Sequence, residues 1–183
     1  MKRFLRENGL SLVLFGLFLL TLLFGQILTG FRQYNEDQAE HGGERVELGE
    51  YLQTGHFLES TMENWESEFL QMFLYIILTA YLYQKGSSES RKLDGDNPQD
   101  RDPRKSKDDP DAPWPVRKGG LVLKLYENSL ALAFLLLFLL SFWLHGVGGR
   151  LEYNEDQLEH GRATVSVLGY MSTSRFWFES FQN

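Results

Sequence analysis

The sequence predicts an all-α membrane protein: a tandem parallel repeat of helix–acidic loop–helix units, with three transmembrane helices present and a fourth truncated. Two observations carry this prediction. The nine residues YNEDQAEHG at 34–42 return as YNEDQLEHG at 153–161, with eight of nine identical. Each copy also follows a long apolar run. Because self-similarity at a fixed spacing indicates a repeated architecture, we interpret the chain as two units built around this motif.

The composition excludes several kinds of site. The chain has 183 residues and a formal net charge of −7 at pH 7, and this acidic balance argues against a nucleic-acid surface, which needs a basic stripe. It has no cysteine, and therefore neither a disulfide framework nor a thiolate metal centre. No nucleophile motif, HExxH pair, phosphate-binding loop or dinucleotide fingerprint occurs. We expect a protein that is not an enzyme and uses no cofactor.

The first apolar run predicts a transmembrane helix over about residues 9–30. Residues 8–31 carry no charge, and residues 10–28 include nine leucines. At about 1.5 Å per residue, this helix spans a hydrocarbon core of about 30 Å. A basic start followed by an apolar run is also typical of a cleaved signal peptide. The length of the run and the lack of an A-x-A-like site after it favour a retained helix.

The first connecting loop, residues 32–64, holds eight acidic and two basic residues. We expect the first helix to continue through the motif and to end at Gly42, a typical glycine C-cap. Residues 44–51 predict a short strand-like or irregular piece. Thr54 is the expected N-cap of a new helix. This helix enters the membrane over about residues 65–83, with a tryptophan as its interfacial anchor.

Residues 84–119 predict a disordered linker. All five prolines of the chain lie here, among eight acidic and nine basic residues, with few large apolar side chains. Such a segment cannot bury enough surface to offset its ordering entropy. The run DGDNPQDRDPRKSKDDPD lacks the ligand spacing of a calcium-binding EF-hand, which favours a solvated linker.

The third apolar run predicts a transmembrane helix over about residues 122–146. Residues 130–144 include eight leucines, and His145 at the far end is expected to have no special role. The second external loop, residues 147–183, contains the second motif. The chain stops after the aromatic-rich TSRFWFESFQN, where the first unit continues into its second span. We therefore expect a truncated chain that lacks the last helix of a four-span protein.

The likeness between the predicted units, residues 1–83 and 120–183, extends beyond the motif. The matches are ENGLSL with ENSLAL, Leu48-Gly49 with Leu168-Gly169, Glu59-Ser60 with Glu179-Ser180, and Asn64 with Asn183. Basic residues concentrate in the amino-terminal tail and the linker, which predicts that both are cytoplasmic and that both motif loops are external. Because two spans separate the units, they point the same way and form a parallel repeat rather than an inverted one.

The pattern E-N-[GS]-L-x-L, apolar run, Y-N-E-D-Q-x-E-H-G, L-G, then N-W-x-S-E-F-L resembles a family of small uncharacterised bacterial membrane proteins, known as a domain of unknown function. The resemblance covers nearly the whole chain outside the linker. It implies a multi-pass protein of the bacterial cytoplasmic (inner) membrane and a duplicated four-span architecture. It implies no activity and no site residue.

The motif is a candidate metal site, at Asp37, Glu40 and His41 and at their counterparts Asp156, Glu159 and His160. On a helix, residues four apart share a face, so each histidine lies beside an aspartate. A histidine with carboxylates suits a divalent transition metal. The alternative is structural: a solvated helix end whose histidine complements the negative end of the helix dipole.

Three functions follow as hypotheses. The first is a non-enzymatic structural or interaction module whose paired extracytoplasmic loops pack together, with the lipid bilayer as its surroundings and a protein partner or homo-oligomer left open. The second is a transporter or ion conduit, suggested by the duplication and by Gln26, Gln71 and Thr79. The spans carry no ionisable residue at mid-depth, where coupling sites normally lie. The third is metal or ligand binding at the motif pair.

Overall fold

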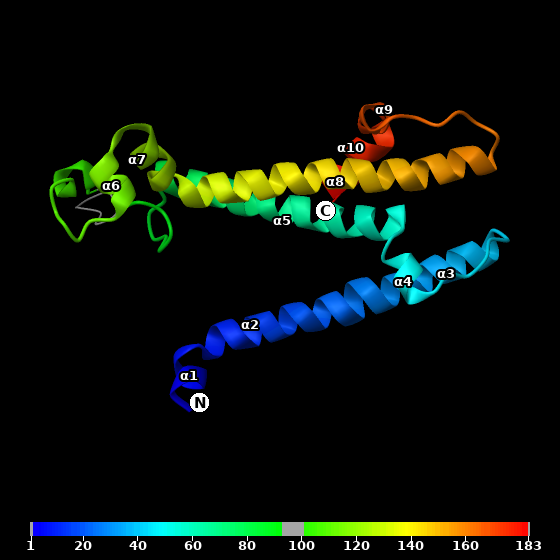
Figure 1. Cartoon of the computed structure of the whole chain (residues 1–183), viewed down its shortest axis with the longest axis horizontal. Coiled ribbons are helices and arrows are strands. Elements are labelled where there is room, and N and C mark those ends of the chain that lie inside the picture. Colours follow the sequence, from blue (N-terminus) through cyan, green and yellow to red (C-terminus); the bar gives the residue numbers. More distant parts are fainter. Residues whose placement is uncertain (1, 93–100, 183) are drawn as a thin grey trace. The chain divides into compact units, whose positions relative to one another are not determined.

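The computed structural model describes residues 2–92 and 101–182, and its main elements are all helices, which confirms the all-helical part of the prediction (Figure 1). They form two compact units: residues up to Asn64 together with those from Trp143 onward, and residues Trp65–Phe142. In chain order the elements are α1 (Lys2–Glu7), α2 (Gly9–Leu20), the π-helical η1 (Thr21–Thr29), α3 (Gly30–Glu40), α4 (Leu48–Tyr51), α5 (Gly55–Tyr81), the 3-10 turn η3 (Pro103–Ser106), α6 (Trp114–Lys118), α7 (Gly120–Glu127), α8 (Ser129–Glu159), α9 (Val167–Met171) and α10 (Ser174–Gln182).

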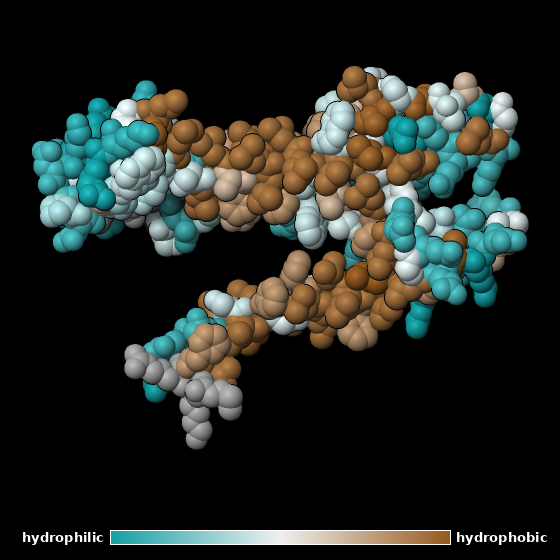
Figure 2. Space-filling model, viewed as in Figure 1, coloured by the Kyte–Doolittle hydropathy of each residue, from teal (hydrophilic) through white to brown (hydrophobic). Residues whose placement is uncertain are grey.

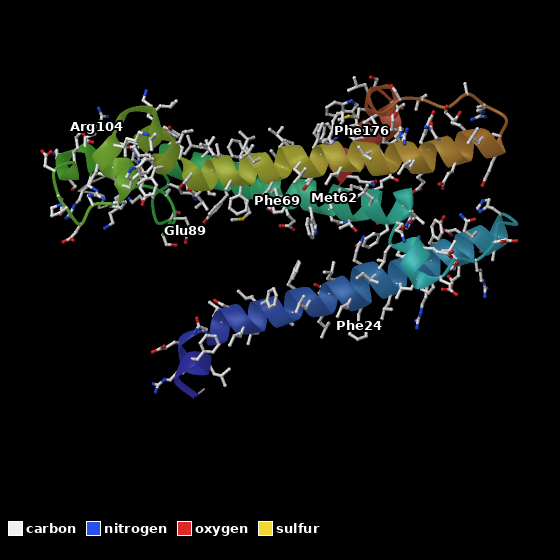
Figure 3. All side chains as sticks on the ribbon, viewed as in Figure 1. Phe24, Met62, Phe69, Glu89, Arg104 and Phe176 are labelled. Atoms are coloured by element: carbon white, nitrogen blue, oxygen red, sulfur yellow. The ribbon has the colours of Figure 1, made fainter. Side chains whose placement is uncertain are left out.

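The first long helix runs from Gly9 to Glu40 through α2, η1 and α3. Its apolar side chains are largely exposed along α2 and η1; Phe24 is 59 % exposed and projects outward from the helix (Figure 3). The space-filling view shows a continuous hydrophobic stretch over these elements (Figure 2). An exposed apolar surface of this length matches the hydrocarbon of a bilayer better than it matches water.

Two described helices, residues 9–40 and 129–159, are long and apolar enough to cross a membrane. They contain the first predicted span and most of the third. The third predicted span, about 122–146, is interrupted at Asn128, which lies between the end of α7 and the start of α8. The Asn128 side chain donates to the carbonyl of Lys124 at 2.8 Å. The span predicted at 65–83 lies largely in α5 and stays a prediction.

The motif ends its helix as the sequence predicted. Gly42 has a φ of 77° and Gly161 a φ of 66°, the left-handed conformation that glycine adopts after a helix. The amide of Gly43 donates to the carbonyl of Gln38 at 2.8 Å, and the corresponding bond closes the second copy. This is the 6→1 bond of a Schellman motif, so the expected glycine C-cap is confirmed.

The motif asparagine ties the next segment back to the helix in both copies. The Asn35 side chain accepts from the amide of Val46 at 2.8 Å and donates to its carbonyl at 3.1 Å. Asn154 makes the same two bonds with Val165, at 2.8 and 2.9 Å. The loop after each motif therefore lies along its own helix.

The segment 44–51 is only partly irregular. Residues 48–51 form the helical turn α4, where the sequence suggested a strand-like piece. A capping box is the physical reason: Glu47 and Glu50 each bond to the other's backbone amide and satisfy the first free amides of the turn.

Threonine caps the next helix in both halves. The Thr54 hydroxyl accepts from the amide of Phe57 at 3.2 Å, and α5 begins directly after it, as predicted. Thr173 holds the amide of Phe176 in the same way at 3.3 Å, and α10 follows. The same local signals therefore start a helix at corresponding points of the two halves.

The start of α5 packs closely on α8, and glycine makes the approach feasible. A Cβ placed on Gly148 would lie 2.5 Å from the backbone nitrogen of Glu59 and 2.9 Å from its Cα. A Cβ on Gly55 would lie 2.8 Å from the backbone nitrogen of Glu152. Both obstacles are backbone atoms that cannot move aside, so small residues on each helix set how close the helices come.

The second unit joins the remainder of α5 and α8 to η3, α6 and α7. Phe69 and Phe134 pack with ring centroids 6.3 Å apart, and a small apolar core joins Ala112, Val116 and Leu123. Of the predicted linker, residues 93–100 lie outside the described residues. The predicted domain boundaries and the disorder of the linker stay predictions.

We expect Gly148→Ala to destabilise the folded chain, because the new methyl group meets the backbone of Glu59. Overpacking of this kind costs about 1–3 kcal/mol of unfolding free energy. Gly16→Ala is the matched control, since nothing lies within 4 Å of its added Cβ and alanine is the better helix former. Thermal unfolding in detergent measures both; equal melting temperatures for the two variants would contradict the close packing.

Candidate functional site

The six motif residues predicted as metal ligands lie at the surface. Asp37, Glu40, His41, Asp156, Glu159 and His160 are all exposed. Nδ1 of each histidine lies 2.8 Å from the backbone carbonyl four residues earlier, that of Asp37 or Asp156. These contacts fit the structural interpretation of the motif, and metal binding at the motif stays a prediction.

A tyrosine after each motif packs against a glycine of the preceding long helix. A Cβ on Gly30 would collide with the hydroxyl of Tyr51, and a Cβ on Gly149 with the ring and hydroxyl of Tyr170. Both tyrosines are fully buried, and each packs on the motif tyrosine of its own half. The two halves thus build the same aromatic contact.

The two buried hydroxyl groups differ in their partners. Tyr51 Oη has no hydrogen-bond partner among the described residues. Tyr170 Oη lies 2.7 Å from Oε1 of Glu59 and 2.6 Å from Oε2 of Glu179. The second copy therefore links a carboxyl group of α5 to one of α10 through a phenol, and this junction is the candidate site.

The geometry around Tyr170 requires a proton on one carboxyl group. A phenol has a single proton, so it can donate to only one of its two carboxyl neighbours. The other carboxyl must itself be protonated and donate to the phenolic oxygen. Burial, together with the nearby charge of Glu152, raises the pKa of Glu59 to about 9. Glu59 therefore carries the proton, and Tyr170 donates to Glu179.

Glu179 is the charged member of the pair. Its Oε1 accepts from Nε of Arg175 at 2.7 Å, and its Oε2 lies 3.7 Å from Nε2 of the fully buried His145. Burial acts to raise the pKa of Glu179, but His145, Tyr170 and Arg175 together lower it to about 2. The carboxylate is thus held ionised in a nearly dry environment.

The surroundings of His145 differ from the sequence expectation of an interfacial histidine with no special role. Its ring is covered by Phe176 of α10, with ring centroids 4.7 Å apart, and Figure 3 shows Phe176 beside α8. Arg175 continues the cluster outward, with Nη2 3.4 Å from Oε1 of Glu152. A histidine and three carboxyl groups therefore meet around one phenol and one guanidinium.

Three of these side chains have the composition and spacing of a metal-binding group. In the described part of the chain, Glu59, His145 and Glu179 each offer one ligand atom, and all these atoms lie within 4.8 Å of one another. One imidazole nitrogen with two carboxylate oxygens suits a divalent transition metal. The same arrangement also holds a proton on Glu59, beside the Tyr170 hydroxyl.

The first half has a neutral pair in the corresponding place. Gln26 Nε2 donates to Oγ of Ser60 at 2.9 Å and to Oγ1 of Thr61 at 3.2 Å. Counted with the spacing of the motif, Gln26 corresponds to His145 and Ser60 to Glu179. An amide–hydroxyl contact in one half is therefore replaced by an imidazole–carboxylate contact in the other.

Sequence comparison within the chain missed this site because it paired Glu59-Ser60 with Glu179-Ser180. The structure shows that the motif spacing continues instead: Tyr51, Thr54 and Phe57 have the same contacts as Tyr170, Thr173 and Phe176. With that spacing, Glu179 corresponds to Ser60 of the first half. The site could have been found from the sequence by searching for ionisable residues whose counterparts in the first half are neutral, such as His145 and Glu179.

We expect Tyr170→Phe to destabilise the chain by about 1–3 kcal/mol, because it leaves two buried carboxyl groups without the hydroxyl between them. Tyr51→Phe is the matched control: its hydroxyl is buried without a partner, and its removal should be neutral or stabilising. The measurement is thermal or denaturant unfolding of both variants in detergent. Equal losses would show that the bridge through Tyr170 adds nothing to stability.

The raised pKa of Glu59 predicts how stability changes with pH. The folded chain keeps a proton up to about pH 9 that the unfolded chain loses near pH 4.5. Between these values the unfolding free energy falls as pH rises, by up to about 1.4 kcal/mol per pH unit. The lowered pKa of Glu179 acts below this window: its contribution is present above about pH 4.5 and is lost as pH falls towards 2.

Glu59→Gln should flatten the stability profile between pH 5 and 9, since the amide mimics the protonated carboxyl and does not titrate. Unfolding is measured for both chains in the presence of a chelator, so that no cation competes with the proton. Parallel profiles for the two chains would contradict the assignment of the proton to Glu59.

Comparison with known proteins identifies a family but no activity. No curated protein and no solved structure matches the chain. The family model described as Domain of unknown function (DUF6766) matches residues 1–183, the full length of the sequence. The chain therefore belongs to this family of domains of unknown function.

Proposed function

We propose that the chain is a multi-pass protein of the bacterial cytoplasmic membrane that acts as a non-enzymatic structural or interaction module. In this proposal two parallel helix–loop–helix units place their acidic loops together on the extracytoplasmic side. The spans lie at about 9–30, 65–83 and 122–146. The amino-terminal tail and the linker are cytoplasmic, because both are rich in lysine and arginine.

One observation carries the proposal. The loops of both halves belong to one compact unit. This unit contains the residues up to Asn64 and those from Trp143 onward. The contacts between halves include the Tyr170–Glu59 bond, the close approach of Gly148 to Glu59, and a bond from Gln182 Nε2 to Glu63 Oε1 at 3.2 Å. A packed pair of loops is what a cap or a docking module at a membrane surface requires.

The recurring contacts support duplication of one unit. The asparagine bridge, the glycine C-cap, the tyrosine–glycine contact and the threonine N-cap all occur once in each half. Gln26, which suggested a conduit, has a local explanation, because its amide bonds to two hydroxyl groups of α5. We therefore favour packed loops over a permeation path.

The loop pairing is tested with a cysteine pair at Glu63→Cys and Gln182→Cys. The natural chain has no cysteine, so the two introduced thiols are the only ones present. We expect a short thiol-reactive cross-linker to join them within one chain, because the native side chains are hydrogen-bonded at 3.2 Å. Mobility on a denaturing gel after cleavage in the linker reports the cross-link.

Two controls separate pairing from orientation. Co-expression of the two single-cysteine chains detects cross-links between molecules. Pre-treatment of intact spheroplasts with a charged, membrane-impermeant maleimide should block the reaction, since the pair faces outward. A cross-link that survives the maleimide would contradict the orientation, and no cross-link at all would contradict the pairing of the loops.

A further inference from the structure

We propose that Glu59, His145 and Glu179 form a binding site for one divalent transition-metal ion. This site is distinct from the YNEDQxEHG motif. It joins α5 of the first half to α8 and α10 of the second, so a bound ion would link the two halves directly.

The geometry favours an ion over a surface cluster of acids. His145 is fully buried, Glu59 is 6 % exposed, and the Glu179 side chain is 14 % exposed. Their ligand atoms lie within 4.8 Å of one another. Donors around one ion at about 2.0–2.2 Å are about 3–4 Å apart, so small side-chain rotations bring the three donors together.

The charge balance of the cluster also fits a divalent cation. Glu59, Glu152 and Glu179 contribute three carboxyl groups, and Arg175 contributes one guanidinium within the same set of contacts. When all three carboxyl groups are ionised, two negative charges remain uncompensated in a buried place. One divalent cation neutralises them without any added proton, whereas the free cluster needs protons to do so.

The surrounding side chains already fix the orientation of the carboxyl groups by hydrogen bonds. Tyr170 contacts one oxygen of Glu59 and one of Glu179, and Arg175 occupies the other oxygen of Glu179. Carboxylate ligands of metal ions are normally fixed by hydrogen bonds of this kind. An ion would therefore meet preoriented ligands.

Comparison with the first half indicates that packing alone does not require His145 and Glu179. At the place of His145 and Glu179 it has Gln26 and Ser60, which form a neutral hydrogen bond. The same helix contact is thus made without any ionisable group. Replacing a neutral pair by a buried histidine and carboxylate adds a desolvation cost that metal binding would offset.

The test uses the full chain, purified in detergent, stripped with a chelator and dialysed at pH 7.5. Zn²⁺ and Mn²⁺ are titrated by calorimetry, and bound metal is counted by elemental analysis after desalting. We expect about one ion per chain for at least one of the two metals. Glu59→Gln and His145→Gln should weaken its affinity by more than about 100-fold, and Tyr170→Phe by about 10–100-fold.

Matched variants distinguish this site from the alternatives. His145→Gln installs the residue that the first half uses at the same place, so it preserves a packing solution that the fold already contains. The double variant His41→Ala/His160→Ala removes both motif histidines and should bind metal like the natural chain. Unfolding measured with chelator present checks that each variant is folded.

Three results would overturn the proposal. One is the absence of stoichiometric binding of either metal to the natural chain. The second is unchanged affinity in both Glu59→Gln and His145→Gln. The third is a loss of binding in the His41→Ala/His160→Ala variant while Glu59→Gln and His145→Gln still bind. That result would show that the metal binds at the motif pair.

Discussion

The burial of the Glu59 carboxyl group is the constraint on which the rest of the site depends. Gly148 lets α8 approach the backbone of Glu59, and the Glu59 carboxyl group packs against Gly149, so the residue is only 6 % exposed. An ionised carboxylate in such a place costs several kcal/mol unless a proton or a cation compensates it. The phenol of Tyr170, the second carboxyl group and the guanidinium of Arg175 are all arranged around that requirement.

The two halves share the same tyrosine–glycine and threonine-cap contacts but differ in the polar groups beside them. Each sets a buried tyrosine on a helix glycine, and each caps the next helix with threonine. In the first half the tyrosine hydroxyl has no partner, and the nearby contact is between Gln26 and Ser60. In the second half His145 and Glu179 take the places of Gln26 and Ser60, and the Tyr170 hydroxyl lies between two carboxyl groups. In the proposed duplication, one copy can change in this way because the other retains the neutral contact.

Much of the local structure could be predicted from the sequence because it depends on short-range signals. Gly42 and Thr54 mark helix ends through backbone conformation and side-chain capping, and both do so as predicted. The site could not be predicted in this way. Glu59 and Tyr170 are far apart in sequence, and only the packing of α5 on α8 brings them together. A repeat alignment shifted by one residue also matched Glu179 with Glu59, which hid the fact that it replaces Ser60.

The position of the site along α8 affects which ligands can reach it. His145 directly follows the apolar stretch of the helix, and the acidic motif lies further along the same helix. In the proposed topology the hydrocarbon therefore closes one side, while the loops on the other side carry an excess of negative charge. Such loops raise the local concentration of cations and protons and repel anions. In this topology a buried carboxyl pair beneath an acidic surface would favour cations over anions, and the low dielectric below it would strengthen each contact of the cation proposed above.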